Sequence, residues 1–332
     1  MKPLASIEKL INLLKFLLPV VFVLLVGGLL YTLVNSPKTL YGKLPLPLIP
    51  NSLVGRPIWN TTYLKVTKKD RERVFKVKER GFSQSETADI SRKLGFVSTP
   101  ETLSGETLVW REQIKNLSIN KLTGRLEYHD ASFGKTNLGR VAITEKELRD
   151  KVQAFTTSLN LGTEQVDFEN PKLKFLRYSS SESEAEEVSV LEANLVVINY
   201  PVKINGNLLL STNGPESLEA KIVGNGQVVG LEYTNLSVVE EENTTYPLKG
   251  MDEIKKSISR GEAGLVRIEE SVKAPLTNPQ GIAVGEGNTF FYNDRKTNYI
   301  QPVFVFQVVL LGVNNKSEGE IYLPAIAKKY FK

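Results

Sequence analysis

The pattern of hydrophobic and polar positions along this chain predicts helices that alternate with groups of strands. Apolar residues recur at helical spacing in three segments, residues 83–94, 144–159 and 251–260. The first two segments open with a capping box, because Ser83 stands three positions before Glu86 and Thr144 three positions before Glu147. Strand patterns fill the regions between the helices, at residues 107–114, 117–128, 172–178, 187–203, 208–211, 218–223, 227–239, 265–272, 299–311 and 319–326.

This order of elements predicts an α+β fold of repeated helix-plus-antiparallel-sheet modules, in which each helix covers one face of its own sheet. We expect three modules, at residues 58–140, 141–245 and 246–332. Asn225 and Gly226 are typical of a two-residue hairpin turn, so we expect them to join two strands of the second module.

An uninterrupted apolar stretch precedes the modules. Residues 16–34 carry no charged side chain, and at about 1.5 Å per residue a helix of this length spans the roughly 30 Å of a bilayer core. A cleaved signal peptide is the alternative, but a cut after Ser36 would leave Pro37 beside it. We therefore expect a bacterial single-pass cell-membrane protein with a signal anchor, a short cytoplasmic head at residues 1–15 and an extracytoplasmic bulk.

Two features of this N-terminal region predict how it is used. Residues 35–57 include five prolines, which predict a stiff, extended stalk rather than a domain. Gly27 and Gly28 are small enough for another transmembrane helix to pack closely against them. The two glycines are therefore the candidate contact positions for a partner within the membrane.

The composition excludes several classes of chemistry. There is no cysteine and only one histidine, which excludes disulfides, thiol nucleophiles, Cys-ligated zinc and a His-rich metal site. The net charge is +5, and acidic residues interrupt the one basic run, residues 65–80, which we interpret as a solvated strand rather than a nucleic-acid surface. Attraction of this run to anionic lipids or wall polymers is the alternative. We expect no metal, no cofactor, no nucleic acid and no small-molecule substrate.

Three short motifs stand in the order typical of serine transpeptidases: Ser118–Lys121, Ser211–Asn213 and Lys296–Asn298. That chemistry needs the lysine one helical turn after the serine, so that its amine can take the serine proton. Ser118 and Lys121 lie in a strand pattern instead, where residues three apart point to opposite faces. Asn298 also replaces the glycine of the last motif. An envelope serine hydrolase or transpeptidase is therefore the least favoured function.

The remaining candidates for chemistry also favour simpler interpretations. His129 stands beside Asp130, but no nucleophile elbow accompanies the pair, so we interpret it as a surface or loop histidine. Acidic clusters at residues 182–187 and 240–242 lack the alternating pattern of a calcium loop and indicate solvated segments. We therefore predict no catalytic residue, and we expect that the protein is not an enzyme.

Six segments between residues 144 and 326 carry a family resemblance: Phe175–Tyr178, Val196–Ile204, Gly226–Tyr233, Tyr246–Glu253, Tyr299–Phe306 and Ile321–Ile326. In their order and content they resemble the YycH/YycI-type accessory proteins of bacterial sensor kinases and, more loosely, PepSY-like modules. The resemblance implies one N-terminal transmembrane helix and an extracytoplasmic α+β part. It also implies a regulatory function, in which the protein contacts a membrane histidine kinase.

The sequence therefore favours a non-catalytic binding or regulatory protein of the cell envelope, whose partner is another membrane or envelope protein. A structural component of an envelope or secretion assembly is the alternative. In that case sheet edges would recruit strands from partners, and the strand at residues 299–311 is the candidate edge.

Overall fold

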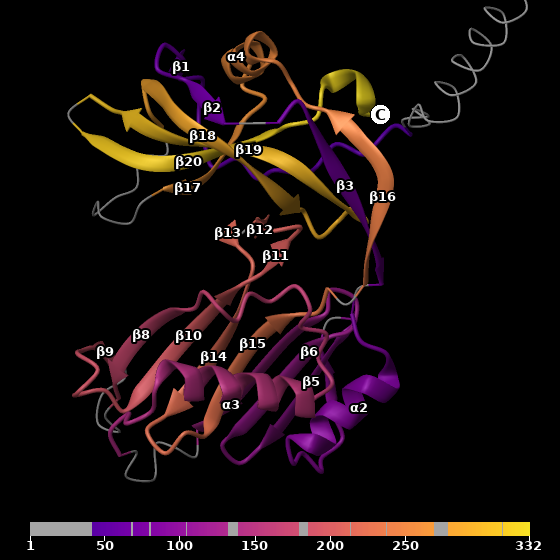
Figure 1. Ribbon diagram of the computed structural model, residues 1–332, viewed down its shortest axis with the longest axis vertical. Coiled ribbons are helices and arrows are strands. Elements are labelled where there is room, and N and C mark those ends of the chain that lie inside the picture. The colour runs from indigo at the N-terminus through magenta and orange to yellow at the C-terminus, as the bar shows by residue number, and fades with distance from the viewer. Residues whose placement is uncertain are drawn as a thin grey trace, which may run out of the picture. The chain divides into compact units, whose positions relative to one another are not determined.

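The computed structural model describes residues 42–332 except residues 68, 80, 104, 132–138, 179–184, 213, 237, 269–277 and 314. These residues contain three α-helices, and their twenty strands form two large sheets (Figure 1). The structure is mostly β, so the predicted α+β class is wrong. The reason is that strands far apart in the sequence combine into two common sheets, whereas we expected each helix to cover a small sheet of its own.

The first sheet has nine strands and is antiparallel throughout. Its spatial order is β4 (Glu101–Leu103), β5 (Thr107–Glu112), β6 (Lys115–Asn120), β7 (Arg125–Asp130), β15 (Val228–Thr234), β14 (Ser217–Val223), β10 (Leu195–Pro201), β8 (Lys172–Arg177) and β9 (Glu186–Glu187). The predicted turn between β14 and β15 is present, but it has three residues, 224–226, instead of two, because Val223 N–H donates to the Gln227 carbonyl at 3.1 Å. Gly226 has a positive φ of 82°.

The second sheet has eleven strands. Its main path is β11 (Lys203–Ile204), β12 (Asn207–Ser211), β18 (Gly281–Asn293), β19 (Tyr299–Leu311), β20 (Lys316–Pro324) and β17 (Gly264–Ile268). The other members are β1 (Ile58–Asn60), β2 (Lys65–Thr67), β3 (Arg71–Glu79), β13 (Gly214–Pro215) and β16 (Val238–Pro247). Strands from residues 58–140 and from 141–245 occur in both sheets, so strand pairing does not follow the predicted module boundaries.

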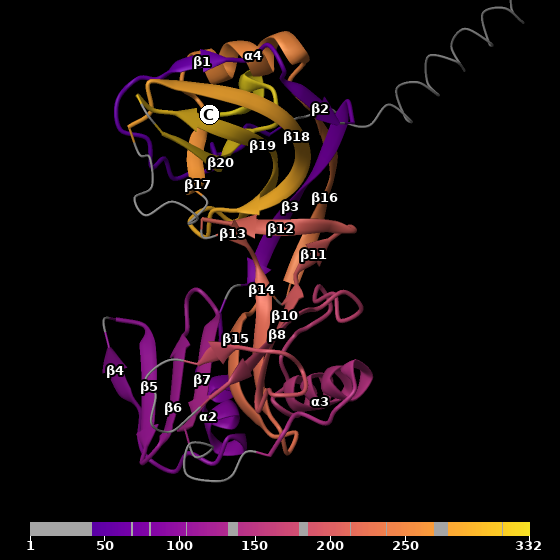
Figure 2. The ribbon, with the colours of Figure 1, turned by 90° about the vertical axis from the view of Figure 1, so that its left-hand side faces the viewer.

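The three predicted helices are confirmed as α2 (Gln84–Lys93), α3 (Glu145–Ser158) and α4 (Met251–Ser259). Ser83 and Thr144 form the capping boxes that the sequence predicts. Figures 1 and 2 show α2 and α3 on the same face of the nine-stranded sheet. Their apolar side chains, such as Ile90 and Val152, join Leu117, Leu126 and other inward-facing strand residues in one buried core.

The predicted strands differ from the structure at several points, and two of these differences have a clear local cause. Residues 117–128 form two strands, because Asn120 Oδ1 accepts hydrogen bonds from the backbone N–H groups of Leu122 and Thr123 and so closes a turn. Strand β18 is absent from the prediction. Its three glycines weaken the strand pattern, and one residue pairing is shifted by a bulge between Val284 and Gly287.

Residues 44–52, which we call the strap, are extended but bound along the eleven-stranded sheet, whereas the sequence predicted a stiff, extended stalk at residues 35–57. The backbone of Leu44 pairs with the segment around Phe331, and Gln301 Nε2 donates to the Pro45 carbonyl at 2.9 Å. Leu48 is held from both sides, because its N–H donates to Asp294 Oδ2 at 3.1 Å and its carbonyl accepts from the Tyr292 hydroxyl at 2.9 Å. The prolines thus keep the strap extended against the eleven-stranded sheet.

The turn between β18 and β19 links this sheet to the start of β14. Asp294 is buried, and its carboxylate accepts hydrogen bonds from the backbone N–H groups of Lys296 and Thr297. Arg295 has a positive φ of 58°, and its guanidinium donates to both carboxylate oxygens of Glu216 at 2.8 Å. Glu216 is only 5% exposed, so this bidentate pair is largely shielded from solvent.

The predicted signal anchor at residues 16–34, the head at residues 1–15, and Gly27 and Gly28 lie outside the described residues. Throughout the part of the chain that the structure describes, every helix is too short or too polar to cross a membrane. For the described residues, this finding contradicts the predicted single-pass membrane location.

A buried lysine lies just before α4. Lys249 is 3% exposed, and its Nζ donates to the Pro324 carbonyl at 2.8 Å. Burial lowers the pKa of Lys249, and the charge of Lys328 lowers it further, whereas the charges of Glu262 and Glu253 raise it. The charged amine is therefore less favourable in the folded protein than in water.

We expect Lys249→Met to remove a rise of stability with pH. Between the lowered folded pKa and the unfolded value of about 10.4, the unfolded chain binds more protons than the folded chain, so wild-type stability increases with pH. The variant has no amine to titrate. Urea unfolding from about pH 7 to about pH 10 should show a wild-type-minus-variant difference that grows with pH, and parallel profiles would contradict the burial of a charged amine.

Candidate functional site

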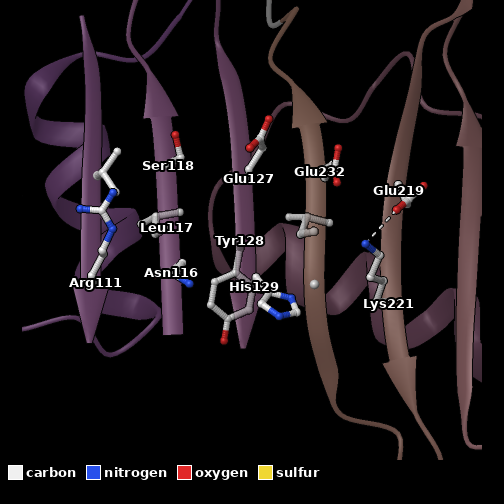
Figure 3. A pocket seen from close by; sticks show the side chains of 13 residues that line it. Arg111, Asn116, Leu117, Ser118, Glu127, Tyr128, His129, Glu219, Lys221 and Glu232 are labelled. Atoms are coloured by element: carbon white, nitrogen blue, oxygen red, sulfur yellow. Dashed lines mark ion pairs between the residues drawn. The ribbon is translucent and has the colours of Figure 1, made fainter. Parts of the chain in front are cut away.

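The nine-stranded sheet has one face that α2 and α3 leave uncovered, and we call it the open face. Alternate residues of a strand point to opposite faces, so Leu117, Tyr128 and Leu231 face the helices while their neighbours point the other way. A shallow hollow of about 460 Å³ lies on the open face across β5, β6, β7, β15 and β14. Figure 3 shows its charged side chains pointing away from the helices behind the sheet.

One line of residues across the open face is acidic, and we call it the acidic row. Glu127 of β7 lies opposite Glu232 of β15, and Glu232 lies opposite Glu219 of β14. Ser118 and Asn199 extend the same line on either side. Like charges directly opposite one another on neighbouring strands destabilise a sheet. The sequence thus accepts an unfavourable arrangement on this face.

The next line of residues on the same face has a cation at each end, Arg111 and Lys221, and we call it the basic row. It runs in register through Arg111, Asn116, His129, Gly230 and Lys221. On each strand the two rows are two residues apart, which is about 6.8 Å along an antiparallel strand. The open face therefore carries a line of three carboxylates beside a line that has a cation at each end.

Ion pairs connect the acidic row to cations on either side of it. Arg125 Nε lies 2.5 Å from Glu127 Oε1, and its Nη2 lies 3.8 Å from Glu232 Oε2. Lys221 Nζ lies 3.4 Å from Glu219 Oε1, and a dashed line marks this ion pair in Figure 3. The three glutamate side chains keep between 28% and 49% of their surface exposed, so their oxygens remain accessible to a ligand.

The basic row has a gap at its centre. A Cβ placed on Gly230 would lie 3.1 Å from Cβ and Cδ of Lys221, so the lysine stem runs alongside the glycine. His129 lies on the other side of the gap. Burial lowers the pKa of His129, and so does the charge of Lys221, whereas Asp130 raises it. The imidazole is therefore held toward its neutral form, in which it both donates and accepts hydrogen bonds.

The three transpeptidase-like motifs are not brought together. Ser118 lies on the open face between Val109 and Glu127, and Lys121 pairs with Glu106 at 3.2 Å. Ser211 is buried in the other sheet, where its hydroxyl donates to the Gly214 carbonyl. The Lys296–Asn298 motif lies in the β18–β19 turn, and Asn213 lies outside the described residues.

The His129 and Asp130 side chains point to opposite faces of β7, as neighbours on a strand do. Asp130 is buried on the helix side, where its Oδ2 accepts from the Tyr128 hydroxyl at 3.4 Å and lies 3.8 Å from Lys115 Nζ. A histidine relay through Asp130 therefore has no geometric support. His129, interpreted from sequence as a surface or loop residue, lies on the exposed side of a strand.

The predicted acidic clusters contribute little to any site. Glu186 pairs with Arg177 at 2.5 Å at the edge of the nine-stranded sheet, while residues 182–184 and the side chains of residues 240–242 lie outside what the structure describes. Among the described residues, no group of three or more histidine, aspartate or glutamate side chains is placed to hold a metal ion, the acidic row included.

The two rows are absent from the sequence-based predictions, although the sequence holds a signal for them. Glu127 and His129 alternate with the buried Tyr128, and Glu219 and Lys221 alternate with the buried Ala220. This alternation predicts the strands themselves, but it does not predict which residues of neighbouring strands lie opposite one another. No protein-family model matches this chain, and no curated protein matches it.

Proposed function

We propose that this chain is a non-catalytic binding protein and that it binds a polypeptide partner through the open face. The observation that carries this proposal is the pair of charged rows on a sheet face that both neighbouring helices leave uncovered. Proteins keep locally unfavourable arrangements mainly where function requires them. Three glutamates in direct register are such an arrangement. Arg125 and Lys221 offset part of their repulsion, and a partner with basic side chains would offset more of it.

The shape of the site favours a macromolecule over a small substrate. Small-molecule sites enclose most of their ligand in a concave pocket, whereas this hollow is shallow and extends over five strands. Charged groups of both signs on a broad surface supply specificity and orientation between proteins. Ser118, the best candidate nucleophile, has a valine and a glutamate as its cross-strand neighbours, and neither can act as the lysine base of that motif.

The resemblance to YycH/YycI-type proteins supports a regulatory role, with a sensor kinase as the partner. The alternative of strand recruitment at residues 299–311 has less support, because β19 lies between β18 and β20 and both of its edges are hydrogen-bonded. Neighbouring segments also cover an outer strand, since Ser52 N–H donates to the Leu265 carbonyl of β17 at 3.0 Å.

We expect that reversing two charges of the acidic row, Glu127→Lys with Glu232→Lys, weakens partner capture at least about tenfold. The full-length chain would be crosslinked in its native cells, and its partners quantified by mass spectrometry. Glu318→Lys with Glu320→Lys, on the other sheet, is the matched control and should keep the wild-type partners. Ser118→Ala should keep them too.

Two results would count against this proposal. One is an identical set of partners for the open-face variant and for its control, which would remove the open face as the binding site. The other is a cellular phenotype that Ser118→Ala abolishes while partner capture stays intact, which would favour an enzyme.

A further inference from the structure

The two rows of the open face are complementary to each other, and this identifies a partner that the proposed function leaves open. We propose that the open face docks on the open face of a second copy of this chain. The two copies are related by a two-fold axis that runs across the strands, midway between the acidic row and the basic row. This inference rests on the proposed function, because it uses the same surface.

The register of the strands determines what such an axis brings together. The two rows lie two positions apart on every strand, so rotation exchanges them while each strand faces its own equivalent. Glu219 then faces the cation of the partner's Lys221, and Glu127 faces the partner's His129, whose neutral ring can donate a hydrogen bond to it. Every such contact occurs twice, because the interface is symmetric.

The alternative two-fold axis, parallel to the strands, is unfavourable. It would place the acidic row of one copy over the acidic row of the other, and the basic row over the basic row. Like charges facing each other across an interface cost several kcal/mol and prevent association. The charge pattern therefore selects one relative orientation of the two sheets.

The spacing of packed sheets fits these side chains. Two sheets pack about 10 Å apart, so glutamate and lysine side chains from opposite sheets meet near the middle. Gly230 has no side chain at the point where the partner's Glu232 arrives, and the Lys221 stem fills the space over it. The partner's Glu232 would therefore pack against this stem rather than against a side chain of residue 230.

Docking also relieves the repulsion within each copy. Glu219 has Lys221 of its own chain at 3.4 Å, and in the dimer the partner's Lys221 would add a second cation. Glu232 has only the distant contact to Arg125 at 3.8 Å among its described ion pairs. Because these contacts are charged and remain near solvent, the dimer should weaken as salt is added.

The test uses two full-length variants, neither of which should form dimers alone, although a mixture of the two should. Glu219→Lys places two cations on β14, and Lys221→Glu places two anions there, so each variant should face its own like charges and dissociate at least about tenfold more readily than wild type. An equal mixture of the two variants restores opposite charges at both symmetric contacts. Sedimentation velocity over a range of concentrations should show dimers for the wild type and the mixture, and monomers for each variant alone.

The chain that carries both changes is the matched control, because it exchanges the two charges and keeps the complementarity. We expect it to form dimers with wild-type affinity, which also shows that the substitutions are tolerated by the fold. A monomeric wild type at every concentration would overturn the inference, and so would a dimer that both single variants retain. A mixture that stays monomeric would overturn the two-fold arrangement.

The proposed function and this inference fail in different ways. If reversal of the open-face charges abolishes capture of another protein while the wild type is monomeric, the open face is still the binding site. Its partner is then a different protein and not a second copy of this chain. If the wild type forms the expected dimer and the reversal leaves capture of other proteins unchanged, the face serves self-association alone.

Discussion

Glu216→Ala should lower the free energy of unfolding by about 3 to 5 kcal/mol, which is the cost of removing one partner from a buried ion pair. Glu216 is 5% exposed and accepts three hydrogen bonds from Arg295, two from Nη2 at 2.8 Å and one from Nε at 3.0 Å. Without the carboxylate, the guanidinium keeps only a long contact from Nη2 to Thr234 Oγ1 at 3.5 Å among its described side-chain hydrogen bonds. An unpaired and shielded cation is the source of the loss.

An exposed pair on the edge of the nine-stranded sheet provides the control. Arg177 and Glu186 are also joined at 2.5 Å, but both side chains are about half exposed, so Glu186→Ala should cost at most about 1 kcal/mol. Urea unfolding of the two variants measures the contrast directly. Adding Arg295→Ala to Glu216→Ala should recover part of the lost stability, because the double variant no longer buries an unpaired charge. Equal losses for the two glutamates would contradict the structural role of the buried pair.

Gly81→Ala should be destabilising by more than about 4 kcal/mol, a loss large enough to need a specific structural cause. Gly81 has a φ of 99°, which disfavours any residue with a side chain. A Cβ built there would also overlap the backbone carbonyl of Lys121. That carbonyl cannot move freely, because it accepts a hydrogen bond from Phe82 N–H at 3.0 Å, and Asn235 Nδ2 donates to Gly81 itself at 3.1 Å.

Gly206→Ala separates the cost of the positive φ from the cost of the steric overlap with a neighbouring carbonyl. Gly206 also has a positive φ, 78°, but a Cβ there meets nothing within 4 Å. It should therefore show only the backbone cost of about 1 to 2 kcal/mol. The difference between the two variants in urea unfolding measures the steric conflict at Gly81. Similar losses for both would show that the Lys121 carbonyl yields easily and that backbone conformation dominates.

The helices were predictable because their signals are local. Ser83 and Thr144 mark helix starts within four residues of sequence, and both capping boxes form. Sheet membership is not local in this sense. The apolar alternation of β14 predicts a strand, but nothing within it indicates that β15 and β10 are its neighbours while β13, one residue earlier, belongs to the other sheet. The predicted fold class failed at this step.

The candidate site was less predictable than the fold for the same reason. Glu127, Glu219 and Glu232 are scattered over about a hundred residues of sequence, and each alone is an ordinary exposed glutamate. They become a site only when the register places them opposite one another. The composition excluded several classes of chemistry, and the strand pattern around Ser118 argued against a transpeptidase. The positions of the charged rows required long-range pairing that local patterns do not encode.

The passages of the chain between the two sheets have a consequence for cooperativity. Residue Val202 alone separates β10 from β11, and residue Glu216 alone separates β13 from β14. The chain also passes between the sheets after β3 and again before β16, so four covalent crossings join them within one compact unit, residues 44–332. Unfolding of either sheet therefore pulls directly on strands of the other at these crossings. We expect the two sheets to unfold in one cooperative transition, although each would be large enough to count as a domain by itself.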